Sequence, residues 1–294
     1  MTFEYVCWLK TKKEKPGTGG FPGLASGFVD WAARRAMTQG GDGNRKYQNV
    51  ASGVDKELPD VFRRLETDPK VLRPGWCAIH VEFELRRPWF SKDDRYFHPL
   101  HNPLRKDRVF GVPYMSAASW KGLLRWACRM EAGLLEHLER NQGRLDGWRD
   151  PSWITHLFGN AKGEAEEFAR GALLCHPTWF KCIGFEVINP HSRETRAGTM
   201  PIMYEVIPEG TTGKLSLRYA PLPPSGPDPN AILRLLDATE ALIERYGFSA
   251  KRTAGWGIAK IRNWIVIDNY NAAMKTVKLC EIKKYIARIL ENKK

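Results

Sequence analysis

The sequence lacks the features that mark membrane-spanning and secreted proteins. No window of about 18 or more consecutive apolar residues occurs, so no membrane span is predicted. The start, MTFEYVCWLKTKKEK, has one short apolar patch and then lysines, without the longer apolar run of a secretory signal. The six cysteines are scattered and form no CxxC pair, which argues against a disulfide scaffold. We therefore expect a cytoplasmic protein with reduced thiols and no membrane partner.

A recognisable metal-binding pattern is also lacking. Cys175, His176 and Cys182 lie close together in the sequence, but their spacing matches no usual zinc motif. A metal held by these three residues is the alternative reading. We expect no metal and no other cofactor.

Acidic residues are scarce beside basic ones. The 294 residues include 46 Lys and Arg against 33 Asp and Glu, a formal net charge of +13. A surplus of this size favours a polyanionic partner, most commonly nucleic acid; the alternative is a merely basic soluble protein. Hydrophobic residues make up 43% of the chain, which is enough for a packed core and argues against global disorder.

Glycine and proline divide the chain. A stretch near the start, PGTGGFPGLASG, cannot form a regular element, so residues 1–75 are expected to form an N-terminal elaboration or arm. A core is expected over residues 76–267, followed by a basic amphipathic helix in residues 268–294. Two long polar loops interrupt the core, one after its first strand and one at residues 189–212. Such loops inside a compact domain are often functional.

Hydrophobic periodicity predicts the elements of the core. Ile79, Val81, Phe83 and Leu85 alternate with polar residues, as in a half-buried strand. The order expected is strand, helix, strand, strand, helix, strand, over residues 77–87, 116–141, 171–180, 214–222, 230–246 and 258–267. This is the ferredoxin-like (RRM-like) βαββαβ order of an α+β protein. It places both helices on one face of a four-stranded antiparallel sheet and leaves the other face for a partner.

The first expected helix carries a candidate phosphate site. Ser116 or Ser119 can cap it, and small residues at its start allow close approach of a ligand. Lys121 and Arg125 add positive charge one and two turns in, on the face opposite the apolar stripe. The alternative is an ordinary capped helix with solvated basic residues.

A second candidate is the glycine-rich loop AKRTAGWG, residues 250–257. Gly255 and Gly257 permit positive φ and close approach to a ligand, while Lys251 and Arg252 supply charge. The alternative is a tight helix-to-strand connection. In the expected fold both loops lie at one edge of the sheet, so one site would collect the four cations of the two segments.

The two segments resemble those of the RAMP superfamily of CRISPR proteins. Residues 113–125, PYMSAASWKGLLR, resemble the P-x-I-P-G-S-S-x-K-G-x-x-R segment of that family, and residues 251–257 resemble its C-terminal glycine-rich loop. The stretch FEVINPHSRETRAGTMPIMYEVIPEGTTGKLSL resembles the middle of Cmr-type subunits, so the likeness covers about residues 76–267. It implies a crRNA-binding subunit of a type III effector complex, closest to the Cmr-type (III-B) capping subunit. The partners implied are crRNA, complementary target RNA and other effector subunits of the RAMP and large-subunit classes.

By the same resemblance, residues 88–112 and 189–212 are inserted arms that hold the guide–target duplex by its phosphates. The basic residues expected to contact RNA there are Arg105, Lys106, Arg193 and Arg196. Aromatic residues of the first arm, Trp89, Phe90, Tyr96 and Phe97, are candidates for stacking on bases. The alternative for these aromatics is packing on a neighbouring subunit.

The sequence departs from the family at two points. Ala117, Ala118 and Ser119 replace Gly-Ser-Ser, so one hydroxyl is lost. His101 occupies the place of the aspartate that repeating backbone subunits carry in their first arm, which favours a non-catalytic subunit.

Three alternatives to a non-catalytic crRNA-binding subunit stay open. The first is a metal-dependent RNA endonuclease using Asp93 or Asp94, although these two residues also suit a solvated turn. The second is a guide-processing nuclease using His98 or His101 as general base. The third is an adaptor that binds other proteins through exposed aromatic residues.

Overall fold

The computed structural model describes residues 72–93, 100–107, 112–160, 169–190, 201–223, 226–270 and 273–291. The elaboration expected for residues 1–75 therefore lies almost wholly outside the described residues, as do Asp94, His98, Arg193 and Arg196.

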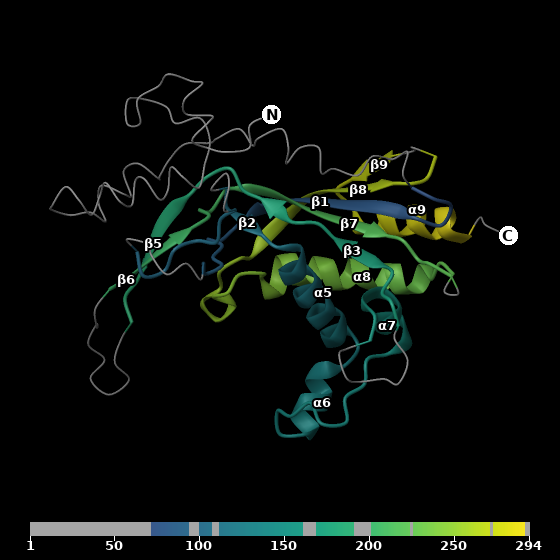
Figure 1. Ribbon diagram of the computed structural model, residues 1–294, viewed down its shortest axis with the longest axis horizontal. Coiled ribbons are helices and arrows are strands. Elements are labelled where there is room, and N and C mark those ends of the chain that lie inside the picture. Colours follow the sequence, from purple (N-terminus) through teal and green to yellow (C-terminus); the bar gives the residue numbers. More distant parts are fainter. Residues whose placement is uncertain are drawn as a thin grey trace, which may run out of the picture.

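A five-stranded antiparallel sheet forms the centre of the protein, in the order β3-β7-β1-β8-β9 (Figure 1). Its strands are β1 (Cys77–Leu85), β3 (Leu173–Cys175), β7 (Thr212–Tyr219), β8 (Ala259–Ile267) and β9 (Ala273–Thr276). β1 is central and pairs with β7 on one side and β8 on the other. The first four strands in this order are those of the predicted βαββαβ arrangement, which the structure confirms, and β9 extends it by one strand.

Alternation along the strands separates the two faces of the sheet. Ile79, Val81, Phe83 and Leu85 are buried. The neighbouring residues that are also buried are Leu215 and Leu217 of β7 and Ala259, Ile261, Trp264 and Val266 of β8. They face helices α5 (Ala117–Glu131) and α8 (Pro229–Ala241), which lie on one side of the sheet with α9 (Leu279–Glu291) (Figure 1). Burying each large apolar side chain here contributes about 1.5–3 kcal/mol.

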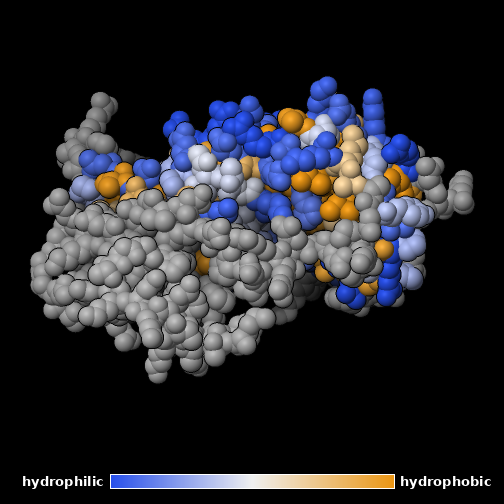
Figure 2. All heavy atoms as spheres, turned by 90° about the horizontal axis from the view of Figure 1, so that it is seen from above, coloured by the Kyte–Doolittle hydropathy of each residue, from blue (hydrophilic) through white to orange (hydrophobic). Residues whose placement is uncertain are grey.

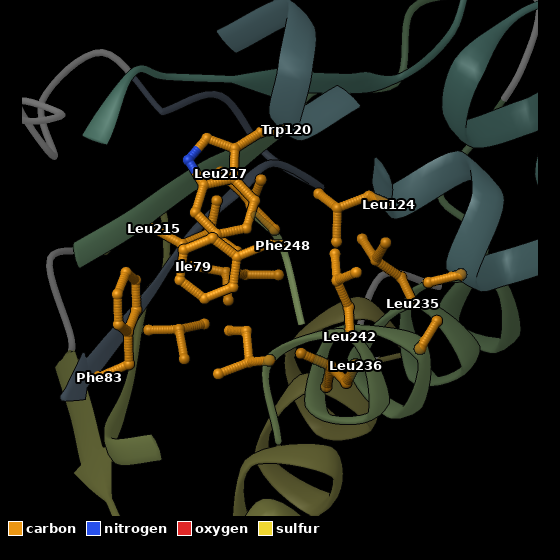
Figure 3. Close-up of a cluster of buried hydrophobic side chains, with 14 of the residues drawn as sticks. Ile79, Phe83, Trp120, Leu124, Leu215, Leu217, Leu235, Leu236, Leu242 and Phe248 are labelled. Atoms are coloured by element: carbon orange, nitrogen blue, oxygen red, sulfur yellow. The ribbon is translucent and has the colours of Figure 1, made fainter. Parts of the chain in front are cut away.

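The helices close the core with buried apolar side chains. Trp120 and Leu124 come from α5, and Leu235 and Leu236 from α8, and all four belong to the buried cluster (Figure 3). Phe248 fills the space between them, with its ring centroid 4.9 Å from that of Trp120. The helical spacing predicted from Trp120 is confirmed as far as Glu131.

The opposite face of the sheet is polar. Figure 2 looks down on the sheet from above, and most of the described atoms on that side are hydrophilic. The side chains facing away from the helices include Glu82 and Glu84 of β1, Lys214 and Arg218 of β7, and Lys260 and Arg262 of β8.

Two predicted elements are divided in the structure. The helix expected over residues 116–141 ends at Glu131, and Gly133, at φ 92°, leads into a separate helix α6 (Leu134–Arg140). The strand expected over residues 171–180 is two strands, β3 and β4 (Thr178–Trp179), because Pro177 between them cannot donate a ladder hydrogen bond. β4 pairs with β2 (Tyr114–Met115), and α7 (Ser152–Phe158) precedes β3.

Two other regions hold more strand than predicted. The loop expected over residues 189–212 contains β6 (Ile202–Val206), which forms a hairpin with β5 (Gly184–Ile188). The C-terminal helix begins only at Leu279, since β9 precedes it. β9 was missed because its sequence, AMKT, is too short to show alternation.

Candidate nucleic-acid interface

Helix α5 begins with the predicted serine cap. Ser116 is the N-cap residue, and its hydroxyl accepts a hydrogen bond from the backbone N–H of Ser119 at 3.1 Å. The two serine hydroxyls are 2.8 Å apart. The cap satisfies one of the four free N–H groups of the first turn, and the others keep the partial positive charge of a helix start.

The basic residues along α5 are less available than the sequence suggests. Arg125 donates from Nε and Nη2 to Oδ2 of Asp150 at 2.8 and 2.5 Å. Arg129 donates to both oxygens of the same carboxylate, and the Trp148 indole adds a further bond at 2.9 Å. The side chain of Asp150 is 3% exposed and that of Arg125 is 18% exposed. We call this group, Arg125, Arg129, Trp148 and Asp150, the arginine clamp.

The clamp keeps Asp150 ionised. Burial opposes the charge, but hydrogen bonds from Arg129, Trp148 and Arg125 outweigh burial and hold the pKa of Asp150 below its usual value. Two guanidinium groups share one carboxylate, so the clamp keeps a net positive charge. Lys121, one turn earlier, is exposed.

The glycine-rich loop meets α5 on another flank. It forms a 3-10 turn at Arg252–Ala254, and the Arg252 guanidinium lies 4.5 Å from the ring centroid of Trp126 on α5. The Lys251 ammonium lies 5.2 Å from the ring centroid of Tyr204 on β6. Both predicted cations are therefore held by aromatic rings.

The four predicted cations do not form one cluster. At about 100° per residue, Lys121 and Trp126 point about 140° apart around the helix. Lys121 and Arg125 thus lie on one flank of the exposed side of α5, and Arg252 lies on the other. Gly122 lies between the flanks. We call this surface, from Ala118 to Arg129 with Arg252 beside it, the α5 ridge.

The glycines of the two segments have different structural roles. A Cβ added to Gly257 would lie 2.5 Å from the backbone nitrogen of Ser249, so packing within the chain requires this glycine. Gly255, at φ 76°, is required by its backbone conformation but faces open space. A Cβ on Gly122 would meet nothing within 4 Å. Gly122 therefore leaves room beside the helix that no described residue uses. A glycine in the middle of a helix costs about 1 kcal/mol relative to alanine.

The first arm contradicts one predicted contact. The Lys106 side chain is 1% exposed, and its ammonium lies 2.5 Å from Oε1 of Glu205 on β6. Oε2 of Glu205 accepts from the backbone N–H of Leu104 at 2.8 Å. A buried, paired ammonium cannot reach a phosphate, so the expectation that Lys106 contacts RNA is wrong. The pair instead joins residues 100–107 to the β5–β6 hairpin.

The other arm residues fall into three groups. Arg105 is half-buried, and its backbone bonds to Ser91 and Tyr114 hold the arm beside the start of α5. Trp89 and Phe90 are buried in the chain's own core, so neither base stacking nor packing on a neighbour applies to them. The remaining predicted aromatics, Tyr96 and Phe97, lie outside the described residues.

The candidates for catalysis and metal binding form no metal-binding cluster among the described residues. Asp93 and His101 are described, and no group of three or more His, Cys, Asp or Glu among the described residues could hold a metal ion. Burial raises the pKa of the Cys175 thiol to about 12, so the thiol is protonated at neutral pH. In the part of the chain that the structure describes, no helix is both long and apolar enough to cross a bilayer.

Together, a ferredoxin-like sheet with one polar face, a serine-capped basic helix and a glycine-rich turn define an RRM-like α+β protein. The comparison with protein families gives a more exact assignment. Residues 82–260, which include both predicted segments, match the RAMP superfamily, and the chain belongs to that superfamily.

Two of the solved structures that match the chain come from CRISPR complexes. One is a chain of a type III-B Cmr-beta complex bound to cognate target RNA, at 16% identity and TM-score 0.50, covering 82% of this chain and 74% of that one. Another is a chain of a Csm3–Csm4 subcomplex of the type III-A interference complex, at 18% identity and TM-score 0.43, covering 72% and 95%. The first likeness shows a shared fold. No curated protein sequence matches.

Proposed function

We propose that the chain is a crRNA-binding structural subunit of a type III CRISPR effector complex. It grips the guide, and the guide–target duplex, through backbone phosphates, and it assembles with other RAMP and large-subunit proteins. Membership of the RAMP superfamily and a net charge of +13 support this role. The observation that carries it is the α5 ridge, where a glycine with open space above it lies between two cationic flanks.

The chemistry of the ridge suits a sugar–phosphate strand. Charge-assisted hydrogen bonds to phosphate are short and strong, and they are indifferent to base sequence. Gly122 lets the strand approach the helix closely, while Lys121 and Arg252 contact phosphates from opposite flanks. The clamp orients Arg125 and still leaves it partly exposed.

The same reading makes the subunit non-catalytic. His101, rather than an aspartate, occupies the position that resembles the family's cleavage site. RNA cleavage by the assembled complex should therefore be unchanged by Asp93→Ala. Loss of cleavage at one site would show instead that the chain is a target-RNA endonuclease.

Binding of a labelled crRNA at several salt concentrations tests the phosphate grip. We expect affinity to fall steeply with salt, and Lys121→Ala and Arg252→Ala each to lower the slope of log K against log salt by about 1. Lys284→Ala, which removes an exposed lysine on α9, is the matched control and should leave the slope unchanged. A flat salt response of the unaltered protein would refute the proposal.

A further inference from the structure

A second polar feature lies on the face of the sheet opposite the helices. A cleft of about 370 Å³ opens where β1, β7 and β8 meet the segment that follows β4. This volume is at the lower end of the about 300–1,000 Å³ of small-molecule sites, so it fits one nucleotide and not a duplex. The cleft is lined by Glu82, Phe83, Trp179, Lys181, Thr212, Gly213, Lys214 and Arg262.

The lining carries more positive than negative charge. Lys181, Lys214 and Arg262 line it with a single carboxylate, Glu82. Lys181 is exposed, and Arg262 is paired with Glu84 at 2.7 Å in a solvent-accessible ion pair. Because such pairs contribute little net stability, Arg262 can exchange this partner for a phosphate.

An aromatic ring forms one wall of the cleft. Trp179 is held in place by packing on Tyr114, with ring centroids 5.1 Å apart and planes at 33°, and by pairing of β4 with β2. A fixed indole beside cations is the arrangement on which single-stranded nucleotides stack.

The carboxylate of Glu82 favours a ligand that carries a hydrogen-bond donor as well as a phosphate. Oε2 accepts hydrogen bonds from Asn263 and Lys275 at 2.8 and 3.0 Å, and Oε1 accepts none from the described residues. Burial opposes ionisation, but the bonds from Lys275 and Asn263 lower the pKa of Glu82, so it is ionised at neutral pH. An ionised Oε1 repels a bare phosphate and attracts an N–H or O–H donor.

We propose that this cleft binds a single nucleotide, with its phosphate on Lys181, Lys214 and Arg262, its base against Trp179, and a base amino or ribose hydroxyl donating to Glu82. The nucleotide can be an unpaired residue of an RNA strand or a free nucleotide. The site is separate from the α5 ridge, since the sheet lies between them. It therefore goes beyond the proposed function and does not depend on it.

The test measures nucleotide binding and crosslinking on the full chain. The four ribonucleoside monophosphates are titrated by calorimetry, and a single-stranded RNA with 4-thiouridine is crosslinked and its attachment site mapped by mass spectrometry. We expect crosslinks on the peptide that holds Trp179. We also expect Trp179→Leu and Lys181→Glu each to weaken binding about tenfold or more, since stacking and charge both contribute. Lys260→Glu, exposed on the same face but outside the cleft, is the control and should have little effect.

The outcomes distinguish a free nucleotide from a residue of an RNA strand. They also distinguish failure of the cleft proposal from failure of the α5 ridge proposal. Saturable binding of monophosphates indicates a free nucleotide, whereas crosslinking without such binding indicates a residue of an RNA strand. Competition by inorganic phosphate as strong as by nucleotides would overturn the proposal, as would the absence of both binding and crosslinks. Lys121→Ala should weaken RNA binding while leaving monophosphate binding unchanged, so either proposal can fail alone.

Discussion

Replacing Asp150 by asparagine tests whether the arginine clamp holds the α5 ridge in its observed shape. The substitution keeps the size of the side chain and removes its charge, leaving Arg125 and Arg129 without an anionic partner. Removing one member of a buried ion pair costs about 3–5 kcal/mol, whereas exposed pairs contribute about 0–1 kcal/mol. Asp150 is buried, but both arginines are about one-fifth exposed, so we expect the loss to lie between these ranges, at about 2–3 kcal/mol.

Urea denaturation followed by tryptophan fluorescence measures this loss. Glu84→Gln, which removes the anion of the exposed pair with Arg262, is the control and should cost less than about 1 kcal/mol. Equal stability of Asp150→Asn and the unaltered protein would refute the clamp as a stabilising unit.

The pH dependence of stability gives an independent check. The pKa of Asp150 is lowered in the folded state, against burial, by bonds from Arg129, Trp148 and Arg125. Stability from this carboxylate is thus present above its unfolded pKa of about 3.9 and is lost as pH falls through the lower folded value. Asp150→Asn should lack this acid-dependent component, and a parallel loss in both proteins would contradict the assignment.

Three further predictions concern single sites. Lys106→Met should lower the free energy of unfolding by about 3–5 kcal/mol in urea titrations, because it removes the cationic partner of a buried carboxylate; a change below about 1 kcal/mol would place the pair in solvent. Gly122→Ala should raise stability by about 1 kcal/mol in the same assay, because alanine favours the helix, yet weaken crRNA binding. Unchanged or tighter RNA binding by Gly122→Ala would show that the α5 ridge is not an RNA contact surface. Thiol labelling of the native protein at pH 8 should modify exposed Cys280 and spare Cys77 and Cys175, since burial raises the pKa of both thiols to about 12. Mass spectrometry of labelled peptides checks this, and early labelling of Cys77 would show that the first residues of β1 open.

The elements that could be predicted are those that local periodicity specifies. β1 alternates over its full length, and α5 and α8 repeat apolar residues at helical spacing, so their types and order follow from the chain itself. The serine cap of α5 is equally local, because donor and acceptor are three residues apart. The division at Gly133 was not predicted, although glycine favours the left-handed backbone conformation found there.

The site was harder to predict because its charges find partners far along the chain. Lys106 and Glu205 are 99 residues apart, and Arg125 and Asp150 are 25 residues apart, with helix α6 between them. From the sequence alone, a basic residue in a polar loop is interpreted as a phosphate contact. Only the fold shows that a distant carboxylate pairs with it. Glu205, a lone acid within IMYEV, was the one visible signal of a buried partner.

The Lys106–Glu205 pair also bears on how this protein can be altered. It couples two insertions that leave the sheet at different points, and the backbone N–H of Glu205, which donates to Asn102 at 3.1 Å, reinforces the contact. A chimera that received only one insertion from a relative would bring a charge without its counterpart into the interior. Grafting experiments should therefore transfer both segments together, as one exchangeable module.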